Sequence, residues 1–137
     1  VFMNETEAKM LTQENNTIKA IKKVVDLGPK YVVVKRGEYG STLFSKEHGF
    51  YNCPALPIEN VVDPTGAGDS FAGGFFGYLV KNVNGVPAWN DLKKAVVAGT
   101  VMSSQTIQDF SVKALIEVNQ SNFDKLNADL VKMSSIS

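Results

Sequence analysis

Residues 63–79 read Asp63-Pro64-Thr65-Gly66-Ala67-Gly68-Asp69-Ser70-Phe71-Ala72-Gly73-Gly74-Phe75-Phe76-Gly77-Tyr78-Leu79. The glycines at 66 and 68 let the backbone turn sharply, and the apolar run behind them is typical of a buried helix. Backbone N–H groups at the start of such a helix lie at the positive end of its dipole, so they can hold a phosphate or another oxyanion. Asp69 falls inside this anion site, which favours a role in taking a proton from an attacking hydroxyl.

The glycines inside the expected helix need a structural reason, because each costs a helix interior about 1 kcal/mol relative to alanine. Gly73 and Gly77 are four residues apart and share one face. We predict that they form a smooth stripe where a neighbouring strand or helix packs closely. A second helix is predicted from Trp89 through Met102.

The composition predicts a single globular domain over residues 1–137. Apolar residues make up 44% of the chain, and 14 basic residues balance 14 acidic ones, so the overall charge gives no reason to expect nucleic acid or a membrane surface as partner. Cys53 is the one cysteine, which excludes an internal disulfide and favours a small buried side chain. With no signal-peptide pattern, we expect a cytoplasmic protein. The apolar start Val1-Phe2-Met3 suggests a cut through a longer chain.

The segment Asn4-Glu5-Thr6-Glu7 follows this first strand-like run and allows two interpretations. Asn4 can be the N-cap of a helix with Glu7 as its capping-box partner. Alternatively, an amide and a carboxylate at the end of a strand can order magnesium-bound water, because open α/β sheets bind ligands at that edge.

The middle of the chain alternates helix and strand patterns. A helix is predicted over Ile18 to Leu27, an interior strand of a parallel sheet over Tyr31 to Val34, and a return strand over Phe50 to Cys53. Between the strands, Gly37-x-x-Gly40 is either a hairpin turn or a turn that passes close under a nucleotide. His48 lies in a polar turn, where we expect it to be exposed and without a catalytic role.

Two common nucleotide-binding loops are excluded by their residues. There is no G-x-x-x-x-G-K-[ST], and Phe71 stands where the dinucleotide fingerprint needs its third glycine. A cluster of cysteine and histidine with metal-ligand spacing is also missing from the sequence.

Three motifs together resemble the C-terminal half of the ribokinase-like carbohydrate kinases, the PfkB family: Asn4-x-x-Glu7, Gly37-x-x-Gly40, and Asp63-Pro64-Thr65-Gly66-Ala67-Gly68-Asp69-Ser70-Phe71-x-Gly73. The resemblance covers nearly the whole chain and implies a three-layer α/β/α fold, here its C-terminal portion with a partial, mostly parallel sheet. Members of this family phosphorylate a sugar or nucleoside hydroxyl with ATP and Mg²⁺. They are roughly twice as long as this chain, and their N-terminal half contributes much of the sugar site and the lid.

The resemblance also implies roles for individual residues. It makes Asp69 the general base, with Gly66, Ala67 and Gly68 as the anion hole for the transferring phosphoryl group. The residues implied on the nucleotide side are Asn4 and Glu7 near the triphosphate, with Glu7 reaching Mg²⁺ through water, and Lys35, Gly37 and Gly40 beside the nucleotide. Asp63 and Thr65 match positions that hold a monovalent cation such as K⁺ in some members, and the helix from Lys94 to Thr100 would line the adenine pocket.

The chain departs from ribokinase proper at Ser104 to Ser111, where ribokinase has a glycine-containing turn, and this indicates another subgroup of sugar kinases. We therefore expect the ATP-binding, catalytic portion of a carbohydrate kinase that acts on a small sugar or nucleoside. A non-catalytic nucleotide- or phosphometabolite-binding regulatory module is the alternative, and Asp69 in the anion loop argues against it. Without its upstream half, we expect the chain alone to have little or no kinase activity and to be able to self-associate.

Overall fold

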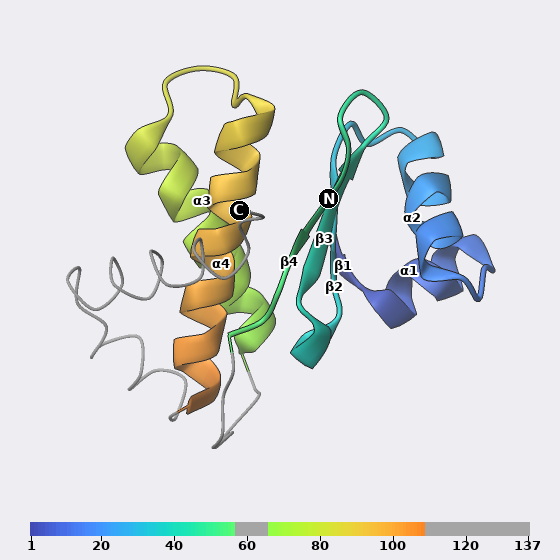
Figure 1. Ribbon diagram of the computed structural model, residues 1–137, viewed down its shortest axis with the longest axis horizontal. Coiled ribbons are helices and arrows are strands. Elements are labelled where there is room, and N and C mark those ends of the chain that lie inside the picture. The colour runs from blue at the N-terminus through green and yellow to red at the C-terminus, as the bar shows by residue number, and fades with distance from the viewer. Residues whose placement is uncertain (57–65, 109–137) are drawn as a thin grey trace, which may run out of the picture. The chain divides into compact units, whose positions relative to one another are not determined.

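The computed structural model describes residues 1–56 and 66–108, with only the backbone described for 105–108 (Figure 1). The chain divides into two compact units, Val1–Cys53 and Pro54–Ser137. The first unit contains β1 (Phe2–Asn4), α1 (Glu5–Thr12), α2 (Thr17–Asp26), β2 (Val32–Lys35), the short 3₁₀ helix η1 (Gly37–Tyr39), β3 (Ser41–Ser45) and β4 (Gly49–Cys53). The second contains α3 (Ala67–Asn82) and α4 (Trp89–Gln108). The α/β class and the predicted helices and strands of these ranges are confirmed.

The first unit is built on a sheet with the strand order β1-β2-β3-β4. β1 and β2 are parallel, whereas β2–β3 and β3–β4 are antiparallel, so the expectation of a mostly parallel sheet is wrong for the described strands. The length of the connections explains the difference. A parallel pair needs a long crossover, which α1 and α2 supply, whereas the short turns at 36–40 and 46–48 can join only antiparallel neighbours.

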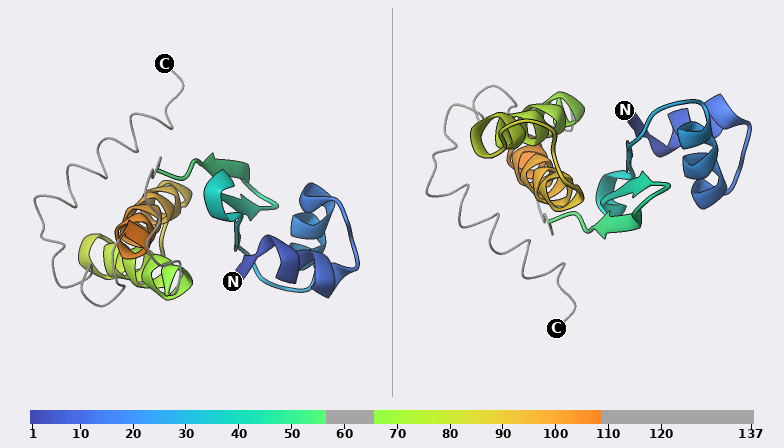
Figure 2. Two further views of the ribbon diagram at one scale, coloured as in Figure 1. Left: turned by 90° about the horizontal axis from the view of Figure 1, so that it is seen from below. Right: turned by 90° about the horizontal axis from the view of Figure 1, so that it is seen from above.

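The core of this unit lies between the sheet and its two helices. α1 and α2 lie together on one face of the sheet in both views of Figure 2. The buried cluster there consists of Ala8, Ala20, Ile21, Val24, Val25, Val32, Val34 and Phe44. Cys53 is buried, as predicted, and is not part of a disulfide. His48 is exposed, also as predicted.

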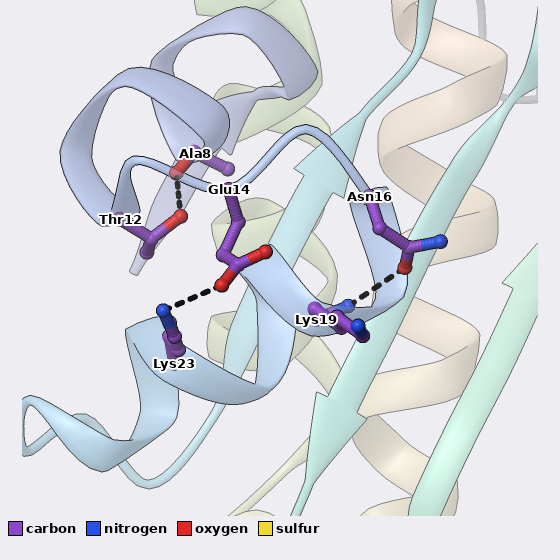
Figure 3. A network of polar contacts seen from close by, with 6 residues as sticks. All are labelled: Ala8, Thr12, Glu14, Asn16, Lys19 and Lys23. Atoms are coloured by element: carbon purple, nitrogen blue, oxygen red, sulfur yellow. Dashed lines mark hydrogen bonds and ion pairs between the residues drawn. The ribbon is translucent and has the colours of Figure 1, made fainter.

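Polar contacts fix the connection between α1 and α2 (Figure 3). The Thr12 hydroxyl donates to the carbonyl of Ala8 at 2.8 Å, and the Asn16 side chain caps α2 by accepting from the Lys19 N–H at 3.0 Å. The Lys23 ammonium lies 2.6 Å from the carboxylate of Glu14. The hydrogen bond from Lys23 and the charge of Lys23 hold the pKa of Glu14 below its ordinary value. These bonds set the path of the chain from one helix to the next.

The described part of the second unit is a helical hairpin in which α3 and α4 lie side by side (Figure 1). Within this hairpin the close approach of α3 and α4 is made at Gly74 and Gly99. A Cβ on Gly74 would lie 2.8 Å from the carbonyl oxygen of Ala98, whereas one on Gly73 or Gly77 would meet nothing within 4 Å. Gly73 and Gly77 therefore do not form the predicted close-packing stripe against α4. Spacing of four residues identifies a face of a helix but does not say which face has a neighbour.

The helices within 1–56 and 66–108 include no segment both long and apolar enough to span a bilayer.

Candidate functional site

The first group of predicted site residues lies where β1 meets α1. Asn4 caps α1: its Oδ1 accepts from the Glu7 N–H at 2.7 Å, and Glu7 Oε2 accepts from the Asn4 N–H at 2.9 Å. This confirms the capping-box interpretation. The cap uses one oxygen of each side chain, so the Asn4 amide nitrogen and Glu7 Oε1 stay available at an exposed position. Capping and ligand binding are thus compatible at these two residues.

Lys35 lies beside this first group of residues in the sheet. Asn4 is paired with Lys35 across the parallel strands, which places both residues at the carboxyl end of their strands. Lys35 is half-buried, and it forms no ion pair with any residue that the structure describes. An amide, a carboxylate and an ammonium therefore lie together at the edge of an α/β sheet where ligands bind.

The turn after β2 is a hairpin, as one of the two interpretations predicted. The Arg36 N–H donates to the carbonyl of Gly40 at 2.7 Å, and the Gly40 N–H donates to the carbonyl of Gly37 at 3.1 Å. Gly37 and Gly40 have φ angles of 57° and 89°, which side chains with a Cβ rarely adopt. The backbone conformation of the turn therefore favours glycine at both positions. At Gly37 the outer side of the turn carries no side chain.

The second group lies at the start of α3. Gly66 has a φ of 82° and is the N-cap, and the first helical bond runs from the Ser70 N–H to the carbonyl of Gly66 at 2.9 Å. The N–H groups of Ala67, Gly68 and Asp69 therefore precede the hydrogen-bond ladder of the helix. N–H groups at a helix start, together with the helix dipole, are able to hold an anion, and the anion hole at Gly66 to Gly68 stays a prediction.

Asp69 is exposed in the first turn of α3, and its carboxylate accepts no hydrogen bond from the residues that the structure describes. Asp91 offers a direct comparison, because it occupies the first turn of α4. Its Oδ2 accepts from the Ala88 N–H at 2.9 Å, which is an ordinary capping contact. Asp69 makes no such capping contact with the residues that the structure describes, and its side chain is exposed.

The structure thus brings together Asn4, Glu7, Lys35, Gly37 and Gly40 within the first unit, and Gly66 to Asp69 within the second. Asp63 and Thr65, the predicted cation ligands, lie outside the described residues, as does the end of the departure at Ser104 to Ser111. In the segment predicted to line the adenine pocket, Lys94 is exposed and residues 95–100 are buried. Within 1–56 and 66–108, no three acidic, histidine or cysteine side chains gather as a metal cluster.

Two residues that the motifs did not single out are Arg36 and Ser41. Arg36 is half-buried and Ser41 is buried, and they flank the Gly37-x-x-Gly40 turn directly.

The described residues define an α/β protein with two groups of candidate site residues, one at the strand edge and one at the start of α3. The chain belongs to the pfkB family carbohydrate kinases, whose family model matches residues 1–119.

Individual relatives agree with this family. The chain is 47% identical over 77 residues to a cytidine kinase of Thermococcus kodakarensis, a match that covers 55% of this chain and 27% of the relative. It resembles the structure of Arabidopsis thaliana ribokinase complexed with ribose and ATP, with 26% identity and a TM-score of 0.76, covering 92% of this chain and 39% of ribokinase. An aminoimidazole riboside kinase of Salmonella enterica shares the fold, with a TM-score of 0.80 at 23% identity over 92% of this chain and 41% of that protein. The chain spans well under half the length of these proteins.

Proposed function

We propose that this chain is the C-terminal, ATP-binding and catalytic portion of a longer kinase that phosphorylates a hydroxyl of a sugar or nucleoside. The observation that carries the proposal is the exposed Asp69 carboxylate in the first turn of α3, directly after the Gly66 to Gly68 loop. Membership in the pfkB family and the similarity to a cytidine kinase and to ribokinase support a kinase over a non-catalytic binding module.

In the proposed reaction Asp69 is the general base. Its carboxylate accepts the proton of the acceptor hydroxyl while the acceptor oxygen bonds to the γ-phosphorus and the bond from that phosphorus to ADP breaks. The N–H groups of Ala67, Gly68 and Asp69 face the negative charge that builds up on the phosphoryl oxygens. A carboxylate inside an anion site weakens simple phosphate binding, so its position is explained by proton transfer to Asp69.

The residues of the first unit fit the nucleotide. ATP supplies the phosphoryl group, and Mg²⁺ neutralises its charge and keeps several waters when bound. The donor set matches this pair: Lys35 and the Asn4 amide suit phosphate oxygens, and Glu7 Oε1 suits a magnesium-bound water. Gly37 leaves space for a close approach, because a Cβ there would meet nothing within 4 Å.

Further parts of the proposal follow from the family resemblance. Asp63 and Thr65 would hold K⁺, and the segment from Lys94 to Thr100 would line the adenine. Acceptor contacts and the lid would come from the part of the kinase that precedes this chain, so we expect the chain alone to lack activity. A cytoplasmic location and self-association of the isolated chain remain predictions.

The test is a transfer assay on the longer protein with ATP, Mg²⁺ and a panel of pentoses, hexoses and nucleosides, with product detected by ³¹P NMR. We expect one acceptor class to be phosphorylated, with one ADP formed for each phosphorylated product. ATP binding without transfer to any member of the panel would contradict the kinase proposal and favour the regulatory module.

A further inference from the structure

The loop that joins α3 to α4 (Figure 1) contains the one Asn-Gly pair of the sequence, Asn84-Gly85. The loop spans residues 83–88, and both residues of the pair are exposed. Gly85 has a φ of 84°, a conformation that residues with a Cβ rarely adopt. Glycine therefore suits this turn, and it leaves the backbone nitrogen at this position unshielded by a side chain.

An asparagine side chain can react with the backbone nitrogen that follows it. The Gly85 nitrogen would attack Cγ of Asn84 and close a five-membered succinimide ring, while the Asn84 amide nitrogen leaves as ammonia with the proton of the attacking N–H. Water then opens the ring at either carbonyl. Opening at Cγ gives aspartate, and opening at the main-chain carbonyl gives isoaspartate. The net reaction consumes one water and releases one ammonia.

The reacting groups of this pair are free of internal hydrogen bonds. Within residues 1–56 and 66–108, neither the Asn84 side chain nor the Gly85 N–H has a hydrogen-bond partner. The two groups can therefore approach each other without breaking a bond of the fold, whereas bonded groups would first lose that stabilisation.

Asn82, two residues earlier, shows the opposite case. Its side-chain nitrogen donates to the carbonyl of Tyr78 at 2.9 Å. The N–H that follows it, from Val83, donates to the carbonyl of Leu79 at 2.9 Å. The end of α3 thus holds both groups that would have to react at Asn82.

We propose that Asn84-Gly85 is a site of spontaneous deamidation, and that the fold directs the reaction to this asparagine by leaving its amide and the next N–H unbonded. The product carries a new carboxylate two residues after the end of α3. Negative charge near the C-terminus of a helix is unfavourable, so the modification acts on the same helix that carries Asp69.

The first test follows the unmodified 137-residue chain in mildly alkaline buffer, with tryptic peptides analysed by mass spectrometry over time. Cleavage after Lys81 and Lys93 gives one peptide that contains Asn82, Asn84 and Asn90. Fragment ions locate the exchange of an amide for a carboxylate, and isoaspartate is recognised by its distinct backbone fragments. We expect Asn84 to convert at least about tenfold faster than the other two asparagines.

Val83→Gly is the matched variant, because it puts a second Asn-Gly pair into the same peptide with both reacting groups bonded at the end of α3. Circular dichroism checks that the helices are retained. In this variant we expect Asn82 to convert at least about tenfold more slowly than Asn84, because two hydrogen bonds must break first. The two rates should become equal in concentrated urea. An unchanged Asn84 in the unmodified chain, equal rates in the folded variant, or a difference that persists in urea would overturn the proposal.

Discussion

The packing of α3 on α4 gives a sharp prediction, because adjacent glycines of one helix face different surroundings. A methyl group on Gly74 would lie 2.8 Å from the carbonyl oxygen of Ala98 and 2.8 Å from Met102 Cγ. The methionine side chain can rotate away, but the carbonyl belongs to the backbone of α4. Gly74→Ala must therefore push the two helices apart.

The magnitude follows from comparison with Gly73→Ala. Both substitutions gain the helix propensity of alanine, about 1 kcal/mol, but a Cβ on Gly73 would meet nothing within 4 Å. The difference in unfolding free energy between the two variants isolates the cost of overpacking, which is about 1–3 kcal/mol in well-packed interiors. We expect Gly73→Ala to be more stable than the unmodified chain, and Gly74→Ala to be less stable than Gly73→Ala by that amount.

Urea unfolding followed by far-ultraviolet circular dichroism measures both free energies. The comparison holds only if the unfolding free energy falls with urea concentration at the same slope in the two variants. Gly77→Ala is a second control, because a Cβ at that position would also meet nothing within 4 Å. Equal stability of Gly74→Ala and Gly73→Ala would refute the close approach of α3 and α4 at this residue.

Three further predictions concern the first unit. Lys23 lowers the pKa of Glu14 below its ordinary 4.5, so the stability that this pair contributes is present above pH 4.5 and is lost as pH falls through the lower folded value. The difference in thermal midpoint between the unmodified chain and Glu14→Gln should therefore shrink on acidification, and a constant difference would contradict the ion pair. Asn4→Ala should cost about 1 kcal/mol of unfolding free energy through the lost cap, while Asn4→Asp should retain most of it. Thr17→Val removes a 2.7 Å hydrogen bond to Glu5 and should cost about 1 kcal/mol by urea unfolding; no loss would show that water replaces the bond.

Much of the fold could be predicted because local chemistry determines it. Asn4 and Glu7 have capping-box spacing, and Gly66 to Gly68 precede an apolar run, so both helix starts could be inferred from single stretches of sequence. The direction of the neighbouring strands was harder to predict. The apolar run before Lys35 fits a strand with parallel neighbours and one with antiparallel neighbours equally well. The short turn at 36–40 was the available signal for an antiparallel partner.

Sequence motifs were enough to nominate candidate site residues, but they could not predict which residues pack closely together. The packing of α4 on Gly74 was not predicted, because the face of α3 that meets α4 depends on how the two helices pack together. Such properties arise from tertiary structure, and no residue spacing encodes them.

The central claim is that Asp69 is the general base, and one comparison tests it most directly. In the longer kinase that we propose, the rate of phosphoryl transfer at saturating ATP and acceptor is measured for Asp69→Asn and for Asp91→Asn. Asp91 is the matched control, because its carboxylate caps α4 through the Ala88 N–H. We predict that Asp69→Asn lowers the rate at least about 100-fold with ATP affinity retained, while Asp91→Asn leaves the rate nearly unchanged. A rate in Asp69→Asn close to that of the unmodified enzyme would contradict the account.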